Sequence, residues 1–161
     1  MTSPPAITES EVHEAQRAWA DGILAIRKTY ASGGNYSEAA RQFIAKHYAY
    51  DLGTVLFKPT LASIQQFRLD TEAALSYFVG GNDQYPEDRG FAILPWTAIR
   101  FEPAGVHIAE GFAASMGNYF LTSETGDEVK AEFTFGFIRG PEGALRIALH
   151  HSSVPYTPFT G

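Results

Sequence analysis

Hydrophobic residues in the first part of the chain recur at helical intervals, which predicts a long N-terminal helix. Thr8 and Glu11 have the spacing of a capping box, in which each side chain bonds the backbone N–H of the other residue. Gly33 and Gly34 end the helix, because glycine readily adopts the left-handed conformation that follows helices. Between these signals the apolar positions share one face: Val12, Ala15, Trp19, Ile23, Ile26 and Tyr30.

Two shorter helices and one short strand are predicted next. Asn35 and Glu38 form a second capping pair at the start of a helix. Residues 51–57 have the composition of a short strand. Residues 70–78 again have helical spacing and end at a pair of glycines. The first half of the chain is therefore predicted to be mainly helical.

The second half of the chain has the alternating pattern of strands. A polar loop at residues 82–89 separates it from the helices. Strands are predicted at residues 96–102, 111–123, 129–139 and 144–155, with turns at 103–105, 124–127 and 140–143.

Helices followed by a run of antiparallel strands indicate the α+β class. A sheet of this size cannot close into a barrel, but it can curve around the N-terminal helices into a half-open cone with a pocket at its wide end. The length of 161 residues fits a single domain over residues 1–161, with an ordered core over about residues 8–156 and loose ends.

Alternation along the strands predicts which side chains face the interior. In the last strand, the face that carries Ile147 also carries His151 and Ser153, so these two are predicted to face the pocket. His150 and Ser152 are predicted to point away. The inner row of the preceding strand is strongly aromatic: Ala131, Phe133, Phe135 and Phe137.

Charge and composition narrow the range of partners. The net charge of −6 and the pI near 5.3 argue against nucleic acid or an anionic membrane as the main partner. The absence of cysteine excludes disulfides and thiolate metal sites. The N-terminus shows no signal peptide, so a cytoplasmic location is the expectation, with a removed targeting segment left open.

Common catalytic and metal-binding patterns are missing. His150 and His151 are neighbours on one strand, so they point to opposite faces and cannot share a metal ion. No nucleophile elbow, phosphate-binding glycine loop or dinucleotide fingerprint occurs. No metal and no cofactor are therefore expected. The candidate polar groups for the pocket are Thr60, Tyr77, Asn118, Tyr119, His151, Ser152 and Ser153.

Four separated strings resemble those of a known family. They are Leu-Phe-Lys-Pro-Thr at 56–60, Ala-Leu-Ser-Tyr-Phe-Val-Gly-Gly at 74–81, Met-Gly-Asn-Tyr-Phe at 116–120 and Leu-His-His-Ser-Ser-Val-Pro-Tyr at 149–156. Together they resemble the iota-class carbonic anhydrases, which are built on the association-domain branch of the NTF2-like cone fold. The resemblance covers about residues 48–156.

The resemblance implies a lyase that reversibly hydrates CO2 to bicarbonate. In members that work without metal, a threonine, a tyrosine and a serine hold the bicarbonate. On this chain these are Thr60, Tyr77 and Ser153. Some members depend on metal, and the lack of a histidine cluster here favours the metal-free kind.

A mechanism follows as a hypothesis. Thr60 and Ser153 orient a water molecule that attacks CO2, while Tyr77 donates a hydrogen bond to the oxygen that gains charge. His151 is either the proton acceptor or a structural residue. Apolar groups of the aromatic row, Phe133 and Phe135, receive CO2.

Two other functions are possible on this fold. The first is a non-catalytic association domain that only assembles. The second is an isomerase or dehydratase, which is disfavoured because the last strands carry no inward Asp. A homodimer fits the carbonic anhydrase and the association domain alike, since broad antiparallel sheets of such cones commonly pair.

Overall fold

The structure is a computed structural model that describes residues 3–159. The first two and last two positions of the predicted 1–161 domain lie outside the described residues. The predicted helices are confirmed, and a short 3-10 helix that was not predicted is added: α1 (Glu9–Ala31), α2 (Tyr36–His47), α3 (Thr71–Val79) and η1 (Phe91–Ile93). None of the helices within residues 3–159 has both the length and the apolar character of a membrane span.

Both predicted capping pairs mark helix starts. The Thr8 side chain accepts from the Glu11 backbone N–H, and the Glu11 carboxylate accepts from the Thr8 backbone, which completes the capping box of α1. Asn35 caps α2 by accepting from the backbone of Glu38. Along α1 most of the predicted apolar face is buried, with Trp19 only 2% exposed at its centre, whereas Tyr30 in the last turn is 40% exposed.

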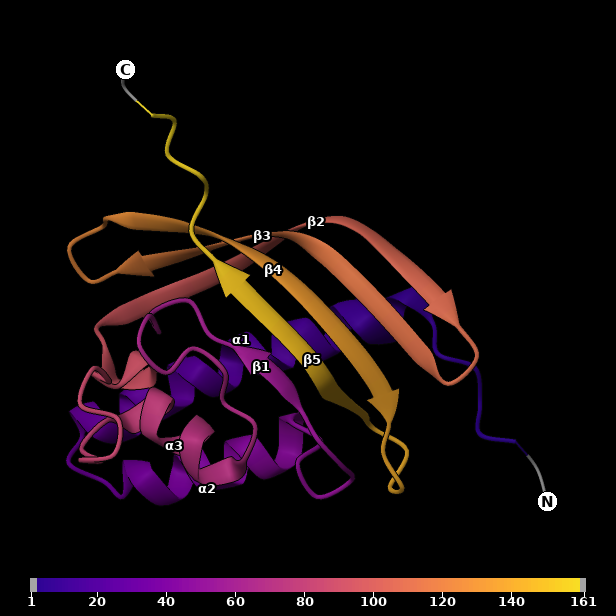
Figure 1. The fold of residues 1–161 in the computed structure, drawn as a ribbon, viewed down its shortest axis with the longest axis horizontal. Coiled ribbons are helices and arrows are strands. Elements are labelled where there is room, and N and C mark those ends of the chain that lie inside the picture. The colour runs from indigo at the N-terminus through magenta and orange to yellow at the C-terminus, as the bar shows by residue number, and fades with distance from the viewer. Residues whose placement is uncertain (1–2, 160–161) are drawn as a thin grey trace.

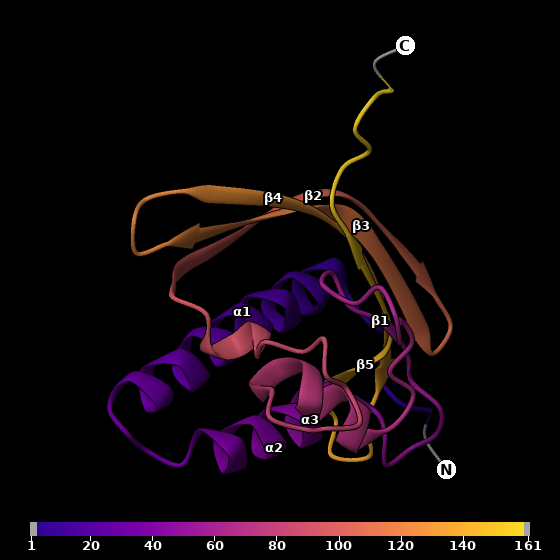
Figure 2. The same cartoon turned by 60° about the vertical axis from the view of Figure 1, so that its left-hand side comes forward.

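Five strands form one sheet in the order β1-β5-β4-β3-β2. β2 to β5 form an antiparallel meander, and the short β1 pairs in parallel with β5 at the edge. Figures 1 and 2 show the sheet curving over α1, with α2 and α3 on the same side. The strands are β1 (Leu56–Lys58), β2 (Trp96–Ala109), β3 (Phe112–Ser123), β4 (Glu128–Arg139) and β5 (Leu145–Ser153).

Two strand predictions differ from the structure. β2 does not turn at residues 103–105 but continues to Ala109, with an irregular register between Pro103 and Gly105. An edge strand tolerates proline because one side of its backbone needs no ladder bonds. β1 is shorter than the predicted 51–57, since only its last residues reach β5.

The aromatic row of β4 faces the helices as predicted. Phe133, Phe135 and Phe137 are each 2% exposed or less. They join one hydrophobic core that also includes the buried faces of α1, α2 and α3. The concave side of the sheet is therefore filled by aromatic side chains.

The orientation predicted for the end of β5 is wrong, because a β-bulge reverses the alternation. Phe137 pairs with Ile147, but the preceding Gly136 pairs with Leu149, so Ala148 is an extra residue without a partner on β4. Beyond such a bulge the side chains exchange faces. His150 and Ser152 are consequently buried, at 2% and 1% exposure, whereas His151 is exposed and Ser153 is half-buried.

Candidate active site

A small cavity lies on the concave side of the sheet, between α1, α3 and the start of the loop after β1. Its volume is about 10 Å³, roughly the space that one water molecule needs. Aromatic rings form most of its wall, and the side chains of Thr60, Tyr77, Tyr119, His150 and Ser152 supply its polar atoms. The residues that line it are Trp19, Phe57, Pro59, Thr60, Tyr77, Phe78, Phe91, Tyr119, His150 and Ser152.

The parallel pairing of β1 with β5 brings two hydroxyl groups together. Phe57 lies beside His150 and Lys58 beside His151, so the chain continues past Pro59 and places Thr60 next to Ser152. The hydroxyl groups of Thr60 and Ser152 are in direct hydrogen-bond contact. Two residues that are 92 positions apart in sequence thus form one pair of hydrogen-bonded hydroxyl groups.

Two tyrosines complete the polar side of the cavity. Tyr119 of β3 donates to the Ser152 hydroxyl. Tyr77 of α3 accepts from the backbone N–H of Leu61 at 3.2 Å. Burial raises the pKa of both phenols well above the ordinary value, so each stays neutral and keeps its proton as a donor.

His150 lies at the buried centre of this cluster of polar side chains. Its Nε2 lies 3.2 Å from the Tyr119 hydroxyl and its Nδ1 lies 2.9 Å from the Tyr48 hydroxyl. Burial, together with a smaller effect of the charge on His151, lowers the pKa of His150 to about 3. The imidazole is therefore neutral near pH 7 and is a weak base.

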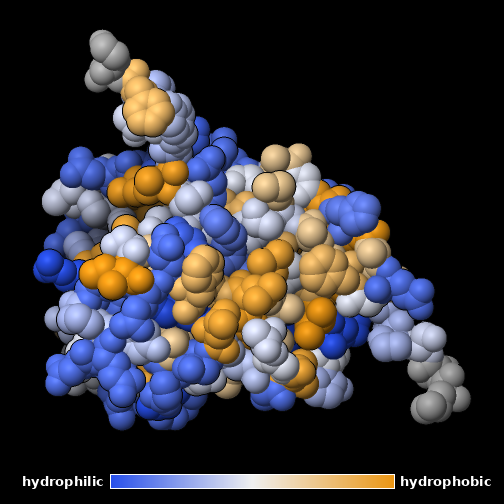
Figure 3. Space-filling view, viewed as in Figure 1, coloured by the Kyte–Doolittle hydropathy of each residue, from blue (hydrophilic) through white to orange (hydrophobic). Residues whose placement is uncertain are grey.

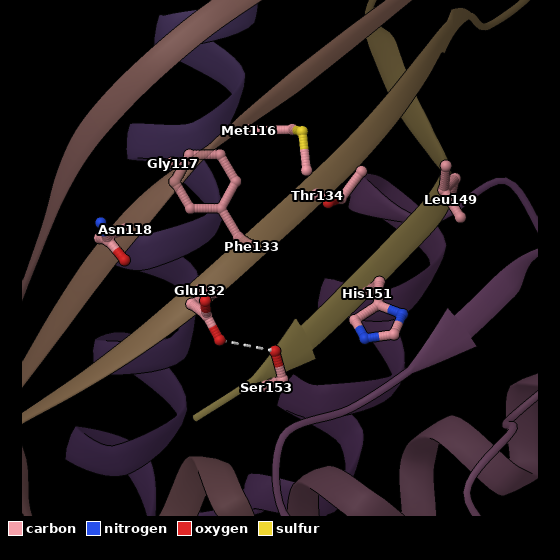
Figure 4. A pocket seen from close by; sticks show the side chains of 9 residues that line it. All are labelled: Met116, Gly117, Asn118, Glu132, Phe133, Thr134, Leu149, His151 and Ser153. Atoms are coloured by element: carbon pink, nitrogen blue, oxygen red, sulfur yellow. Dashed lines mark hydrogen bonds between the residues drawn. The ribbon is translucent and has the colours of Figure 1, made fainter. Parts of the chain in front are cut away.

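His151 and Ser153 lie on the opposite face of the sheet. They line an open groove of about 570 Å³, and the Ser153 hydroxyl donates to the Glu132 carboxylate at 3.1 Å (Figure 4). The prediction that both residues share the inner pocket with Thr60 and Tyr77 is wrong, because the bulge at Ala148 exchanges the two faces of β5. Ser152 takes the inner position instead.

The predicted CO2-binding residues Phe133 and Phe135 do not line the inner cavity. Phe135 stacks on the His150 ring with centroids 4.1 Å apart, and Phe133 packs against Tyr119 at 5.3 Å. Both rings therefore pack against the polar residues of the site, His150 and Tyr119, without lining the cavity itself. The apolar wall comes instead from α1, β1, α3 and η1: Trp19, Phe57, Phe78 and Phe91.

Sequence reasoning missed Trp19, Tyr48 and the role of His150. Trp19 and Tyr48 follow ordinary apolar patterns, and no motif marks them as part of a polar site. Thr60 and Tyr77 are brought together as predicted. Within residues 3–159, no group of three or more His, Asp or Glu side chains is arranged to hold a metal ion.

The fold and the site define a class of protein: an NTF2-like cone with a buried pocket of hydroxyl groups. Two solved structures with lower identity share this fold. They are a putative calcium/calmodulin-dependent protein kinase II association domain from Xanthomonas campestris (TM-score 0.61, 21% identity, 96% of this chain and 95% of that chain) and a putative NTF2-like dehydratase from Streptomyces avermitilis (TM-score 0.56, 16% identity, 92% and 96%).

Closer similarities define the family. The family model for metal-independent carbonic anhydrase matches residues 10–154. A metal-independent carbonic anhydrase from Nostoc sp. is 43% identical over 154 residues, covering 94% of this chain and 75% of the relative. A cyanobacterial iota-carbonic anhydrase solved in complex with bicarbonate has 39% identity and a TM-score of 0.92, covering 98% of this chain and 100% of that chain.

The chain belongs to the metal-independent carbonic anhydrase family. The predicted family, the NTF2-like α+β fold and the predicted activity, reversible hydration of CO2 to bicarbonate, are thereby confirmed.

Proposed function

We propose that CO2 hydration takes place in the inner cavity, with Thr60, Tyr77 and Ser152 as the groups that contact the substrate. The convergence of these hydroxyl groups inside an aromatic wall is the observation that carries the proposal. Hydrogen bonds in a buried site of this kind are worth more than in water, because the surroundings screen them weakly. The apolar wall suits CO2, which has no net charge.

The similarity to a structure solved with bicarbonate supports an anion at this place. Bicarbonate carries oxygen atoms that accept hydrogen bonds, and the cavity presents hydroxyl donors. A ligand that enters would replace the contact between Thr60 and Ser152, since the cavity of about 10 Å³ has no room for it beside that contact. The hydroxyl groups would then turn from each other to the ligand.

A standing hydroxide is not expected in this cavity. A catalytic zinc ion lowers the pKa of bound water from 15.7 to about 7, which corresponds to about 12 kcal/mol of hydroxide stabilisation. Neutral hydroxyl groups cannot supply so much. In our proposal, Thr60 and Ser152 orient a water molecule whose oxygen forms a bond to the carbon of CO2 while one water proton leaves.

The charge that develops on CO2 then needs a donor, and Tyr77 is placed to provide it. Its phenol keeps its proton because burial raises its pKa. His150 is a poor acceptor for the leaving proton, because its pKa is about 3. We therefore assign the proton to water and buffer bases outside the cavity. His151 has no catalytic role in this scheme, since it lies on the other face of the sheet.

The proposal is tested by two substitutions with a matched control. Tyr77→Phe and Ser152→Ala each remove one hydroxyl and are expected to lower kcat/KM for CO2 hydration on the order of 100-fold, as the loss of an oxyanion donor does. Ser153→Ala removes the neighbouring hydroxyl on the outer face and is expected to keep nearly full activity. Stopped-flow CO2 hydration is the measurement.

Full activity in both inner variants would contradict the proposed site, and a large loss in Ser153→Ala would favour the outer groove.

The same assay on chelator-treated protein tests whether the reaction needs a metal ion. Activity is expected to survive chelation, because hydroxyl groups supply the chemistry. Activity that returns only when zinc or manganese is added would contradict a metal-free reaction.

We also propose that the outer face of the sheet pairs two copies of the chain. Figure 3 shows apolar side chains gathered over the middle of this face. Met116 is 59% exposed and Leu56 is 56% exposed, beside the groove of about 570 Å³. Exposed apolar area of this kind marks interaction sites. A two-fold axis would bring the same patch of both copies together.

A further inference from the structure

A continuous series of hydrogen bonds, here called the hydrogen-bond chain, runs from α1 to the cavity. The Trp19 indole N–H donates to the Tyr48 hydroxyl at 3.1 Å, and that hydroxyl lies 2.9 Å from Nδ1 of His150. On the other side of the ring, Nε2 lies 3.2 Å from the Tyr119 hydroxyl. The chain of contacts then continues through two hydroxyl groups to the cavity, those of Ser152 and Thr60.

The Trp19 end of the chain has a fixed direction. An indole N–H is a donor and never an acceptor. The Tyr48 oxygen must therefore accept from Trp19, and its own proton needs another acceptor. Among the described residues, the Tyr48 hydroxyl has hydrogen-bond contacts only with Trp19 and His150. Because Tyr48 is fully buried, a proton without an acceptor would be unfavourable. Nδ1 of His150 is the acceptor available.

The direction passes through the imidazole. A neutral histidine carries one proton, and Nδ1 is occupied as an acceptor, so Nε2 carries the proton. Nε2–H then donates to the Tyr119 oxygen, and Tyr119 donates to Ser152. Each group in the chain thus donates toward the cavity.

A count of donor protons shows that one O–H is left free at the cavity. Six groups each contribute one donor proton, and five contacts join them in line. One donor proton is therefore left over, and the direction places it at the end formed by Ser152 and Thr60. We propose that Tyr48 is a positioning residue that orients this series of hydrogen bonds, and that Trp19 preserves the orientation because it offers the Tyr48 proton no acceptor. The Ser152–Thr60 pair thereby offers bicarbonate a donor O–H.

The orientation also constrains the proton path. A proton from the attacking water could reach His150 only if the hydrogen bonds between the cavity and Tyr48 were reversed, because their donors point toward the cavity. Reversal would leave the Tyr48 proton without an acceptor. The chain therefore binds the anionic product and does not carry the water proton inward. The identity of the ligand rests on the proposed function, whereas the orientation of the chain does not.

Two substitutions at one position test the orientation. Trp19→Phe and Trp19→His remove the indole and leave rings of similar size, so both alter the cavity wall in a comparable way. Only histidine adds a nitrogen that can accept from Tyr48, which permits the reversed chain. Phenylalanine offers no acceptor, so the direction should persist.

The first measurement is the position of the His150 proton by ¹⁵N NMR of the imidazole, made on the wild-type protein and on both variants. Nε2–H is expected in the wild type and in Trp19→Phe, and a substantial Nδ1–H population is expected in Trp19→His. An Nδ1–H tautomer in the wild type overturns the proposal, whether or not either variant folds.

The second measurement is bicarbonate dehydration. KM for bicarbonate is expected to be on the order of tenfold higher in Trp19→His than in Trp19→Phe, as for the loss of one hydrogen bond to a charged group. Equal KM values together with an unchanged tautomer overturn the proposal. Failure of the proposed site gives a different result, since the Nε2–H tautomer would then be found while Ser152→Ala and Tyr77→Phe stay fully active.

Discussion

At the scale of single residues, burial keeps two histidines neutral. It lowers the pKa of His150 to about 3, with a smaller contribution from the charge on His151. It lowers the pKa of His47 to about 4, with a smaller contribution from the charge on Lys46. Both histidines regain a pKa near 6.5 when the chain unfolds. The folded protein therefore binds fewer protons than the unfolded chain in mildly acidic solution.

This difference predicts that stability falls as the pH falls below about 6.5. The free energy of unfolding rises with pH wherever the unfolded state binds more protons. The contribution of each histidine approaches about 1.4 kcal/mol per pH unit as the pH falls toward 5, where the unfolded histidine is almost fully protonated. Urea unfolding between pH 6.5 and pH 5 measures the slope, and His47→Gln is expected to remove about half of it. A free energy of unfolding that stays constant over this range would contradict the prediction.

At the scale of elements, the position of Thr60 depends on how the loop after β1 is attached to α3. Arg68 forms two hydrogen bonds to the Asp88 carboxylate, at 2.8 and 2.7 Å, and both side chains are fully buried. Ser76 of α3 donates to the same carboxylate at 2.6 Å. Nearby, the Glu87 carboxylate accepts from three backbone N–H groups of the loop, those of Ser63, Ile64 and Gln65. These contacts connect the segment that carries Thr60 to the helix that carries Tyr77.

The buried pair predicts a large effect of Asp88→Asn. The substitution keeps the shape but leaves the Arg68 charge buried without a counter-charge, which typically costs about 3–5 kcal/mol. Glu87→Gln removes a neighbouring carboxylate that is only partly buried and is expected to cost clearly less. Chemical unfolding of both variants measures the two losses. Equal losses would show that burial of the ion pair does not decide its contribution.

At the scale of the whole molecule, the sheet separates two surfaces with different roles. The concave face closes over the helices (Figure 2). Between the sheet and the helices, the hydrogen-bonded side chains from Trp19 to Thr60 lie inside an aromatic core. The convex face stays open and carries apolar side chains, with His151 and Ser153 at the groove. Alternation along β5 divides its residues between the two surfaces, and the bulge at Ala148 decides which residues beyond it face inward.

The proposed pairing of two copies predicts a mass of about 35 kDa, twice the 17.6 kDa of one chain. Met116→Glu places a charge in the middle of the apolar patch and is expected to shift the protein to the mass of one chain. Thr97→Glu, at an exposed site in β2 away from the groove, serves as the control. Light scattering after size-exclusion chromatography gives both masses. A wild-type protein that elutes as one chain at micromolar concentration would contradict the pairing.

The local pattern of the sequence determined the elements and part of the site. Capping at Thr8 and Asn35 and the alternation that buries Phe133 and Phe135 are local signals, and the structure confirms them. The family and the positions of Thr60 and Tyr77 at the cavity followed from short strings.

Only the tertiary structure decided which face of β5 meets the cavity and what orients its hydroxyl groups. A bulge depends on the register against β4, so alternation along β5 alone assigned His151 and Ser153 to the wrong side. Tyr48 and His150 are 102 positions apart, and no local pattern indicates that they form a hydrogen bond. Their contact arises because α2 ends beside β5, where its C-cap Tyr48 forms a bridge with Ile147, and this neighbourhood depends on the packing of the whole core.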